Sequence, residues 1–144
     1  MEIRFVCLLL VLLGTIVLSQ DANIRPRYEK FINQHINGQM RENRCDDVIR
    51  SRRITQTNSN DCKETNTFIR AGTGLVRGIC GDAGAPYGLM RRSLKPFNVV
   101  VCKLKNQSRY PHCQYRGQDR TRYIVIACDQ GFPVHFEEDI ILNN

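Results

Sequence analysis

The sequence predicts an α+β domain in which helices come first and strands follow. Near its start, apolar residues recur at three- and four-residue steps, which is the spacing of one helix face. From Phe97 onward, β-branched residues gather in short runs that are typical of strands. The chain has 144 residues, so the part after an apolar leader suits one domain.

Residues 1–19 have the pattern of a signal peptide. Arg4 supplies a positive charge, residues 5–18 are almost unbroken apolar sequence, and small residues precede the expected cut. A membrane anchor is the alternative, but the run is short for a hydrocarbon core of about 30 Å. We therefore expect a secreted protein and a single domain over residues 20–144.

The first expected helix runs from Pro26 to Gly38, two residues that favour a helix start and stop respectively. Its apolar face is formed by Tyr28, Phe31, Ile32, His35 and Ile36. A second helix is expected over 41–53. Residues 68–80 contain three glycines, so any helix there is expected to be short or irregular.

Strands are expected over 97–104 and 123–128, where valine and isoleucine are frequent, and over 134–136. Turn-forming residues dominate 106–117 and 131–133, between these strands. Asn106 opens a glycosylation sequon, which we expect to be exposed.

The cysteines predict a disulfide framework. Seven are present, and removal of Cys7 with the leader leaves an even number in an oxidising compartment. The six are Cys45, Cys62, Cys80, Cys102, Cys113 and Cys128. Composition alone leaves their pairing open. No two form a CxxC pair, so a zinc site is not expected.

The formal charge of +7 favours polyanionic partners, namely RNA, heparin-like glycans or an anionic bacterial surface. Charge of this size is a weak indication on its own, because many basic secreted proteins have no such partner.

Three residues far apart in the chain carry a sharper hypothesis. His35 follows Gln34 in the first helix, Lys63 follows Cys62, and His135 lies in the last strand. A lone histidine is more commonly packed or solvated than catalytic, and a lone lysine is usually a surface group. Together, however, they supply a base, an acid and a cation, which suffice to cleave RNA through its own 2′-hydroxyl.

This combination resembles the pancreatic-type (RNase A) ribonuclease superfamily. Residues 62–68, CKETNTF, match the CKxxNTF signature of that superfamily, and Gln34-His35 and residues 133–136, PVHF, match its two histidine motifs. The resemblance covers essentially the whole mature chain. Six cysteines, residues 27–31 (RYEKF) and residues 113–116 (CQYR) make the chain similar to the angiogenin-like subfamily, in a form typical of an early-branching vertebrate such as a fish.

The resemblance implies a fold and a disulfide pattern. We expect a curved antiparallel sheet with about three helices beside its cleft. The implied disulfides are Cys45–Cys102, Cys62–Cys113 and Cys80–Cys128. The implied protein is a monomer that needs no metal or cofactor.

The resemblance also implies an activity, which is cleavage of single-stranded RNA after pyrimidines through a 2′,3′-cyclic phosphate. His35 would be the general base, His135 the general acid and Lys63 the group that stabilises the transition state. The remaining implied site residues bind or support the substrate, as follows. Gln34 and the Phe136 backbone would bind the phosphate at the cleaved bond, and Lys30 would contact a flanking phosphate. Thr67 would bind the pyrimidine, and Asp129 would lie near the second base. Asn66 would support the site.

Two departures from the family pattern predict low to moderate activity. Glu137 stands where the family usually has an aspartate that orients the second histidine. In angiogenins the C-terminal segment partly obstructs the pyrimidine pocket, and residues 138–142 are a candidate for the same obstruction here.

Two arginine clusters complete the picture. Arg50, Arg52 and Arg53 fall where angiogenin-like proteins carry a nuclear-targeting cluster, although a solvated helix end is the simpler interpretation. Arg91 and Arg92, with a nearby lysine, favour nonspecific attraction of polyanions. By resemblance, a ribonuclease inhibitor and a cell-surface receptor are further candidate partners. The rival hypotheses are a cationic antimicrobial protein that acts without catalysis and a growth-factor-like ligand.

Overall fold

The computed structural model describes residues 23–56, 59–106 and 108–142, so the expected signal peptide lies outside the described residues. The strands are β1 (Thr65–Ile69), β2 (Gly84–Tyr87), β3 (Met90–Ser93), β4 (Phe97–Leu104), β5 (Tyr115–Asp129) and β6 (Phe132–Ile140). An N-terminal helix covers residues 23–35. It is followed by η1 (Glu42–Arg44), α2 (Cys45–Ser51), α3 (Thr73–Arg77) and η2 (Gly78–Cys80).

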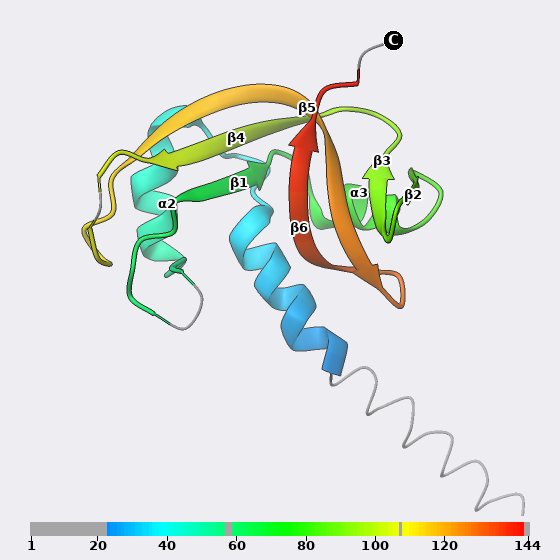
Figure 1. Cartoon of the computed structure of the whole chain (residues 1–144), viewed down its shortest axis with the longest axis horizontal. Coiled ribbons are helices and arrows are strands. Elements are labelled where there is room, and N and C mark those ends of the chain that lie inside the picture. Colours follow the sequence, from blue (N-terminus) through cyan, green and yellow to red (C-terminus); the bar gives the residue numbers. More distant parts are fainter. Residues whose placement is uncertain (1–22, 57–58, 107, 143–144) are drawn as a thin grey trace, which may run out of the picture.

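The long strand β5 organises a curved antiparallel sheet (Figure 1). Its first half pairs with β4, which in turn pairs with β1. Its second half pairs with β6 on one edge and with β3 on the other, and β2 pairs with β3. The N-terminal helix lies between α2 and β6 (Figure 1), which places residues from both ends of the chain at one surface of the sheet.

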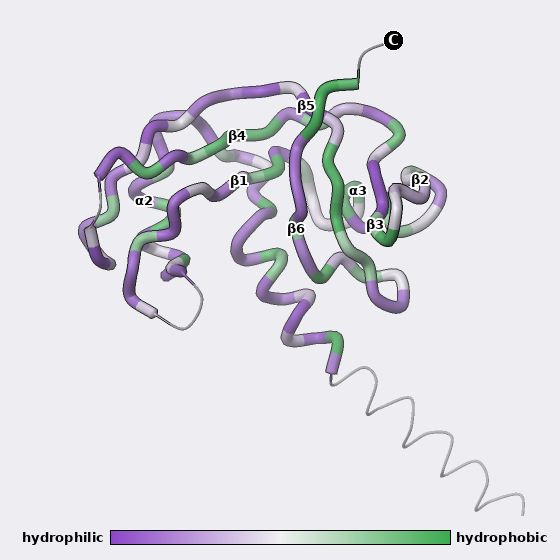
Figure 2. The backbone as a smooth tube through the Cα atoms, in the orientation of Figure 1, coloured by the Kyte–Doolittle hydropathy of each residue, from purple (hydrophilic) through white to green (hydrophobic). Residues whose placement is uncertain are grey.

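Two apolar clusters cover the sheet. One packs α2 through Val48 and Ile49 against Phe68 and Val100. The other packs the N-terminal helix and α3 against β4 and β5. Figure 2 shows the apolar stretches on β4 and on the second half of β5, whereas β6 is largely polar. Only one of the nine residues of β6 is buried, so this strand contributes little to the core.

Three disulfides cross-link the domain, two within the cluster that includes α2 and one beside the cluster that includes α3. Cys45 is bonded to Cys102, Cys62 to Cys113 and Cys80 to Cys128. These are the pairs that the resemblance implies. Each closes a loop of about 50 residues, for which loop entropy stabilises the folded state by roughly 4 kcal/mol.

The structure confirms the α+β class with three α-helices in the described residues, and corrects several boundaries. The first helix is already present at residue 23 and ends at 35, because Ile36 forms a bridge with Ile69 and the Asn37 amide donates to the Ile69 carbonyl. The second helix divides into η1 and α2 and ends at Ser51 instead of residue 53.

The strand boundaries show which sequence signals were informative. β4 has the predicted bounds, and the predicted strands at 123–128 and 134–136 are the inner parts of longer strands. β5 begins at Tyr115, inside the segment expected to form turns. β1, β2 and β3 were missed. Among the described residues, no helix has both the length and the apolar character that crossing a membrane requires.

Candidate active site

A cleft of about 680 Å³ lies where the N-terminal helix, β1 and β6 meet. Its lining residues include Lys30, Gln34, His35, Lys63, Thr67, His135 and Phe136. Seven of the nine residues that the resemblance assigns to catalysis or substrate binding therefore line one space; Asn66 and Asp129 do not. A hollow of about 690 Å³ shares Lys63 and Thr65 with the cleft but contains neither histidine.

His35 is a buried base with a defined tautomer. Its side chain stacks on Phe136 and packs against Phe31, and the residue is 8% exposed. Nδ1 lies 2.8 Å from the carbonyl oxygen of Thr67. A carbonyl only accepts hydrogen bonds, so Nδ1 carries the proton and Nε2 is left with its lone pair.

The pKa of His35 is lowered to about 3, chiefly because burial disfavours the charged ring. The bond to Thr67 opposes this change, while the positive charges of Lys63 and His135 lower the pKa further. His35 is thus a neutral proton acceptor at physiological pH.

His135 contrasts with His35 in its exposure. Its side chain is 57% exposed, and Nε2 lies 2.9 Å from a carboxylate oxygen of Glu137. A β-bulge between Val125 and Ile126 leaves Glu137 without a cross-strand partner, which lets its carboxylate turn toward the histidine two residues earlier. The longer side chain of glutamate therefore still reaches the imidazole through Nε2, and among the described residues Nδ1 of His135 has no hydrogen-bond partner.

Lys63 is held by a short chain of polar contacts. Its Nζ donates to Oδ1 of Asn66 at 2.9 Å, and Nδ2 of Asn66 donates to the Gln34 carbonyl at 2.8 Å. Asn66 is 1% exposed, so it supports the site from beneath the surface. Burial, and then the nearby charge of Lys30, lowers the pKa of Lys63.

Thr67, on β1, lines the cleft together with His35 of the N-terminal helix. The opposite wall contains Asp139, whose side chain is 17% exposed and forms a 3.8 Å ion pair with Arg122. Asp139 and Ile140 pair with Ile124 and Tyr123 of β5. Residues 138–140 thus continue β6 instead of bending over the cleft, and Glu138 and Asp139 line it from that strand.

Asp129 does not have a free carboxylate. Oδ2 accepts a hydrogen bond from Nη1 of Arg27 at 2.8 Å, which joins the end of β5 to the N-terminal helix. Lys30 lies on the same helix and lines the cleft. The carboxylate implied for the second base is therefore engaged by a cation from this chain.

A match to the family model described as "Pancreatic ribonuclease" extends over residues 26–137. The chain belongs to the pancreatic ribonuclease family. It is 42% identical to Ribonuclease-like 3 of Danio rerio over 141 residues, which cover 95% of each protein. It is 40% identical to Angiogenin-4 of Mus musculus over 138 residues, with 93% of each covered.

Comparison with solved structures also supports this family membership. The X-ray structure of zebrafish RNase5 superposes with a TM-score of 0.80 at 48% identity, covering 81% of this chain and 97% of that one. RNASE ZF-1A gives the same TM-score at 45% identity, covering 84% and 97%. The expected angiogenin-like, fish-type membership is confirmed, and the chain is a ribonuclease of the pancreatic type.

The structure adds site residues that the sequence did not indicate. The hydroxyl of Tyr115 donates to the Lys63 carbonyl at 2.7 Å, and its amide donates to Asp46 at 2.7 Å. Arg27 contacts Asp129, which lies 102 positions later in the chain, and Asp139 contacts Arg122. Arg27 lies three residues before Lys30, so helical spacing could have placed it on the cleft side; Asp139 gave no comparable signal.

The arginine cluster is divided in its contacts. Arg50 forms an exposed ion pair with Asp47, and Arg53 is exposed. The Arg52 guanidinium instead donates to backbone carbonyls at the end of the N-terminal helix.

In the parts of the chain that the structure describes, no three histidine, cysteine or acidic side chains gather as metal ligands.

Proposed function

We propose that this ribonuclease cleaves single-stranded RNA on the 3′ side of pyrimidines, without a metal ion, through a 2′,3′-cyclic phosphate. The observation that carries the proposal is the complementary state of the two histidines in one cleft. His35 presents a free Nε2 lone pair, and His135 presents Nδ1 with its other nitrogen held by Glu137.

In the first step, Nε2 of His35 accepts the proton of the 2′-hydroxyl while its oxygen attacks phosphorus. The bond from phosphorus to the 5′-oxygen breaks, and that oxygen takes a proton from Nδ1 of His135. Lys63 stabilises the negative charge that develops on the phosphoryl oxygens. Water then opens the cyclic phosphate with the histidines in exchanged roles.

Pyrimidine preference is proposed for Thr67. Its hydroxyl donates and accepts, so it can match the Watson–Crick edge of cytosine or uracil. The ring of the pyrimidine would stack on Phe136, which itself stacks on His35, while Phe31 packs against the same histidine. Larger purines would meet the wall formed by β6, since Asp139 lines the cleft with Thr67.

The test uses a fluorescent oligonucleotide of single-stranded RNA with one pyrimidine, incubated in EDTA with the oxidised chain and its His135→Ala variant. We expect one cut, 3′ to the pyrimidine, by the native chain alone. A matched oligonucleotide with a 2′-deoxy pyrimidine must stay intact, because it lacks the nucleophile. Cleavage of that control, or loss of the cut in EDTA, would refute the mechanism.

We further propose secretion through the leader at residues 1–19.

A cationic membrane-active role is the second candidate function, and the hairpin between β2 and β3 favours it. At its tip Leu89 is 101% exposed, and Leu94 and Lys95 are exposed close to its base. Bacterial killing by a folded His135→Ala variant would establish that role as independent of catalysis; equal loss of killing and cleavage would exclude it.

A further inference from the structure

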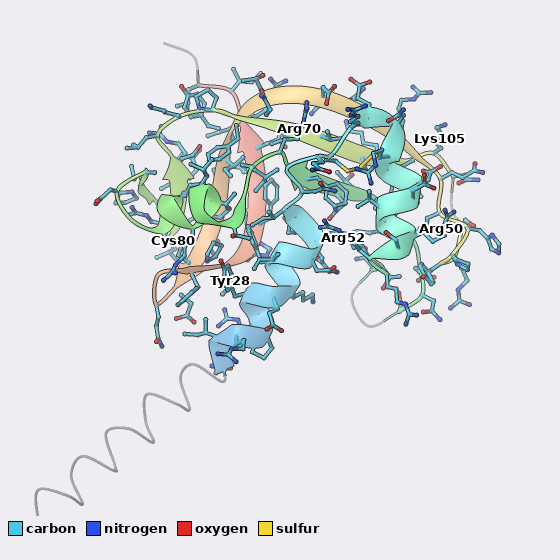
Figure 3. The ribbon with its side chains drawn as sticks, turned by 180° about the vertical axis from the view of Figure 1, so that it is seen from behind. Tyr28, Arg50, Arg52, Arg70, Cys80 and Lys105 are labelled. Carbon is cyan, nitrogen blue, oxygen red and sulfur yellow. A yellow bond between two sulfur atoms is a disulfide. The ribbon has the colours of Figure 1, made fainter. Side chains whose placement is uncertain are left out.

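The C-terminal end of the N-terminal helix is capped by a side chain from elsewhere in the fold. The last carbonyls of a helix lack partners within it. Here, Nη1 of Arg52 donates to the carbonyls of Asn33 at 2.9 Å and Ile36 at 2.8 Å, and lies 3.5 Å from that of Ile32. Figure 3 shows Arg52 between the N-terminal helix and α2. These carbonyls flank His35.

The backbone holds Arg52 in place for this contact. Arg53 has a φ of 54°, its amide donates to the Arg50 carbonyl, and the Ile54 amide donates to the Ile49 carbonyl. This pattern is a Schellman motif that closes α2. Ile49 and Ile54 are each 1% exposed, so the motif is anchored in the core. Arg52 is therefore the C-cap residue of one helix and caps a second one with its side chain.

Two further contacts tie Arg52 to the N-terminal helix and to β1. Nδ2 of Asn33 donates back to the Arg52 carbonyl at 3.1 Å. The Arg52 guanidinium lies 6.0 Å from the ring centroid of Phe68, the neighbour of Thr67 on β1. Since Thr67 is the hydrogen-bond partner of His35, Arg52 touches both elements whose separation sets the position of the imidazole.

We propose that Arg52 is a positioning residue for catalysis, which fixes the helix end so that His35 stays on the Thr67 carbonyl. The proposal rests on the proposed role of His35 as general base. It also reassigns one member of the expected nuclear-targeting cluster. Nη1 of Arg52 is engaged within the fold and the residue is half-buried, whereas Arg50 and Arg53 are the exposed cations of that segment.

The experiment compares four variants expressed from the full-length sequence and purified in oxidised form: Arg52→Ala, Arg52→Lys, Arg53→Gly and Asn33→Ala. Arg53→Gly is the matched control, because it removes one charge from the same segment and suits the positive φ. The measurements are kcat and KM on the single-pyrimidine RNA, and titration of the His35 ring protons by NMR.

Arg52→Ala is expected to lower kcat by about 10- to 100-fold with KM within about twofold, the cost of a displaced catalytic group. The pKa of His35 should rise from about 3 toward 6.5 as the ring gains solvent, while its charged neighbours Lys63 and His135 remain. Arg52→Lys should recover part of kcat, since one ammonium still donates to these carbonyls. Asn33→Ala should cause a smaller loss in the same direction, and Arg53→Gly should match the native chain.

Equal kcat and equal His35 titration in Arg52→Ala and Arg53→Gly would overturn the proposal. So would a change confined to KM, which would indicate a charge effect on RNA binding. If Arg52→Ala does not fold, the Asn33→Ala and Arg52→Lys variants test the proposal instead. Native kcat and native His35 titration in both of them would overturn the proposal. The NMR titration does not need activity, so absence of cleavage by the native chain refutes the proposed function separately.

Discussion

The two histidines of the cleft occupy opposite environments. His35 is buried between aromatic rings and bonded to a backbone carbonyl, so its position and its neutral state follow from the core. His135 stands on a polar strand with more than half of its side chain exposed, and it is restrained by one carboxylate. The position of His35 is thus fixed by packing, whereas that of His135 is fixed by its contact with a carboxylate. Substitutions at the two positions should therefore fail in different ways.

The largest expected effect is loss of activity when either ring is removed. His35→Ala and His135→Ala should each lower kcat by about 10²–10⁴-fold, because each removes a proton-transfer group. Only His35→Ala should also lower the melting temperature, since it opens a space between Phe31 and Phe136. Kinetics and calorimetry on both variants check this contrast. Equal melting temperatures would show that His35 is not part of the core.

The second prediction concerns stability in acid. The pKa of His35 is about 3 in the folded chain and near 6.5 when unfolded, so between these values the unfolded chain binds more protons. Stability that is full above pH 6.5 should therefore fall on acidification, by up to about 1.4 kcal/mol per pH unit for this group.

Urea unfolding between pH 6.5 and 4.5 measures this slope. His35→Gln should show a shallower dependence than the native chain, because glutamine does not titrate. His135→Gln is the matched control at the exposed position, and it should retain the His35 contribution to the slope. Parallel curves for His35→Gln and the native chain would contradict burial as the dominant influence on the base.

The sequence was informative where a local pattern was strong. β4 was predicted to its bounds because its three central valines are β-branched and form a continuous buried run with Cys102. β3 was missed because Met90–Ser93 has no such pattern. It is held by distant contacts: Arg91 donates to three backbone carbonyls, and the Ser93 hydroxyl accepts from the Ile124 amide.

The same distinction applies to the cleft. Short motifs around His35, Lys63 and His135 indicated the chemistry, because their residue types and order are specific. The contacts of Arg52 depend on how two helices meet, which the local sequence does not encode. An arginine that caps a helix and an arginine that is solvated look alike in the chain, so the sequence favoured targeting or a helix end for all three members of the cluster.

The third prediction tests the electrostatic restraint on the acid. Glu137→Gln should lower kcat about three- to tenfold, a smaller loss than removal of His135, because an amide oxygen still accepts a hydrogen bond but carries no charge. Glu137→Asp, with the shorter carboxylate usual in the family, should keep most of kcat. The kinetics of RNA cleavage check both variants, with Glu138→Gln as the neighbouring control. No effect of Glu137→Gln would show that the 2.9 Å contact does not contribute to catalysis.

The smallest expected effect lies at the far end of the cleft, where Arg27 pairs with Asp129. Both side chains are more than a third exposed, so solvent screening limits this pair to roughly 0.2–1 kcal/mol of stability. Arg27→Ala should therefore leave the melting temperature nearly unchanged.

The same substitution should free the Asp129 carboxylate to accept a hydrogen bond from the base that follows the cleaved bond. The preference among second bases should therefore change by a few fold. Cleavage rates on oligonucleotides that differ only at that base measure this, and Arg27→Ala with Asp129→Asn should lose the change. An unaltered preference in Arg27→Ala would place Asp129 outside the substrate path and would leave Lys30 as the exposed cation of this helix that lines the cleft.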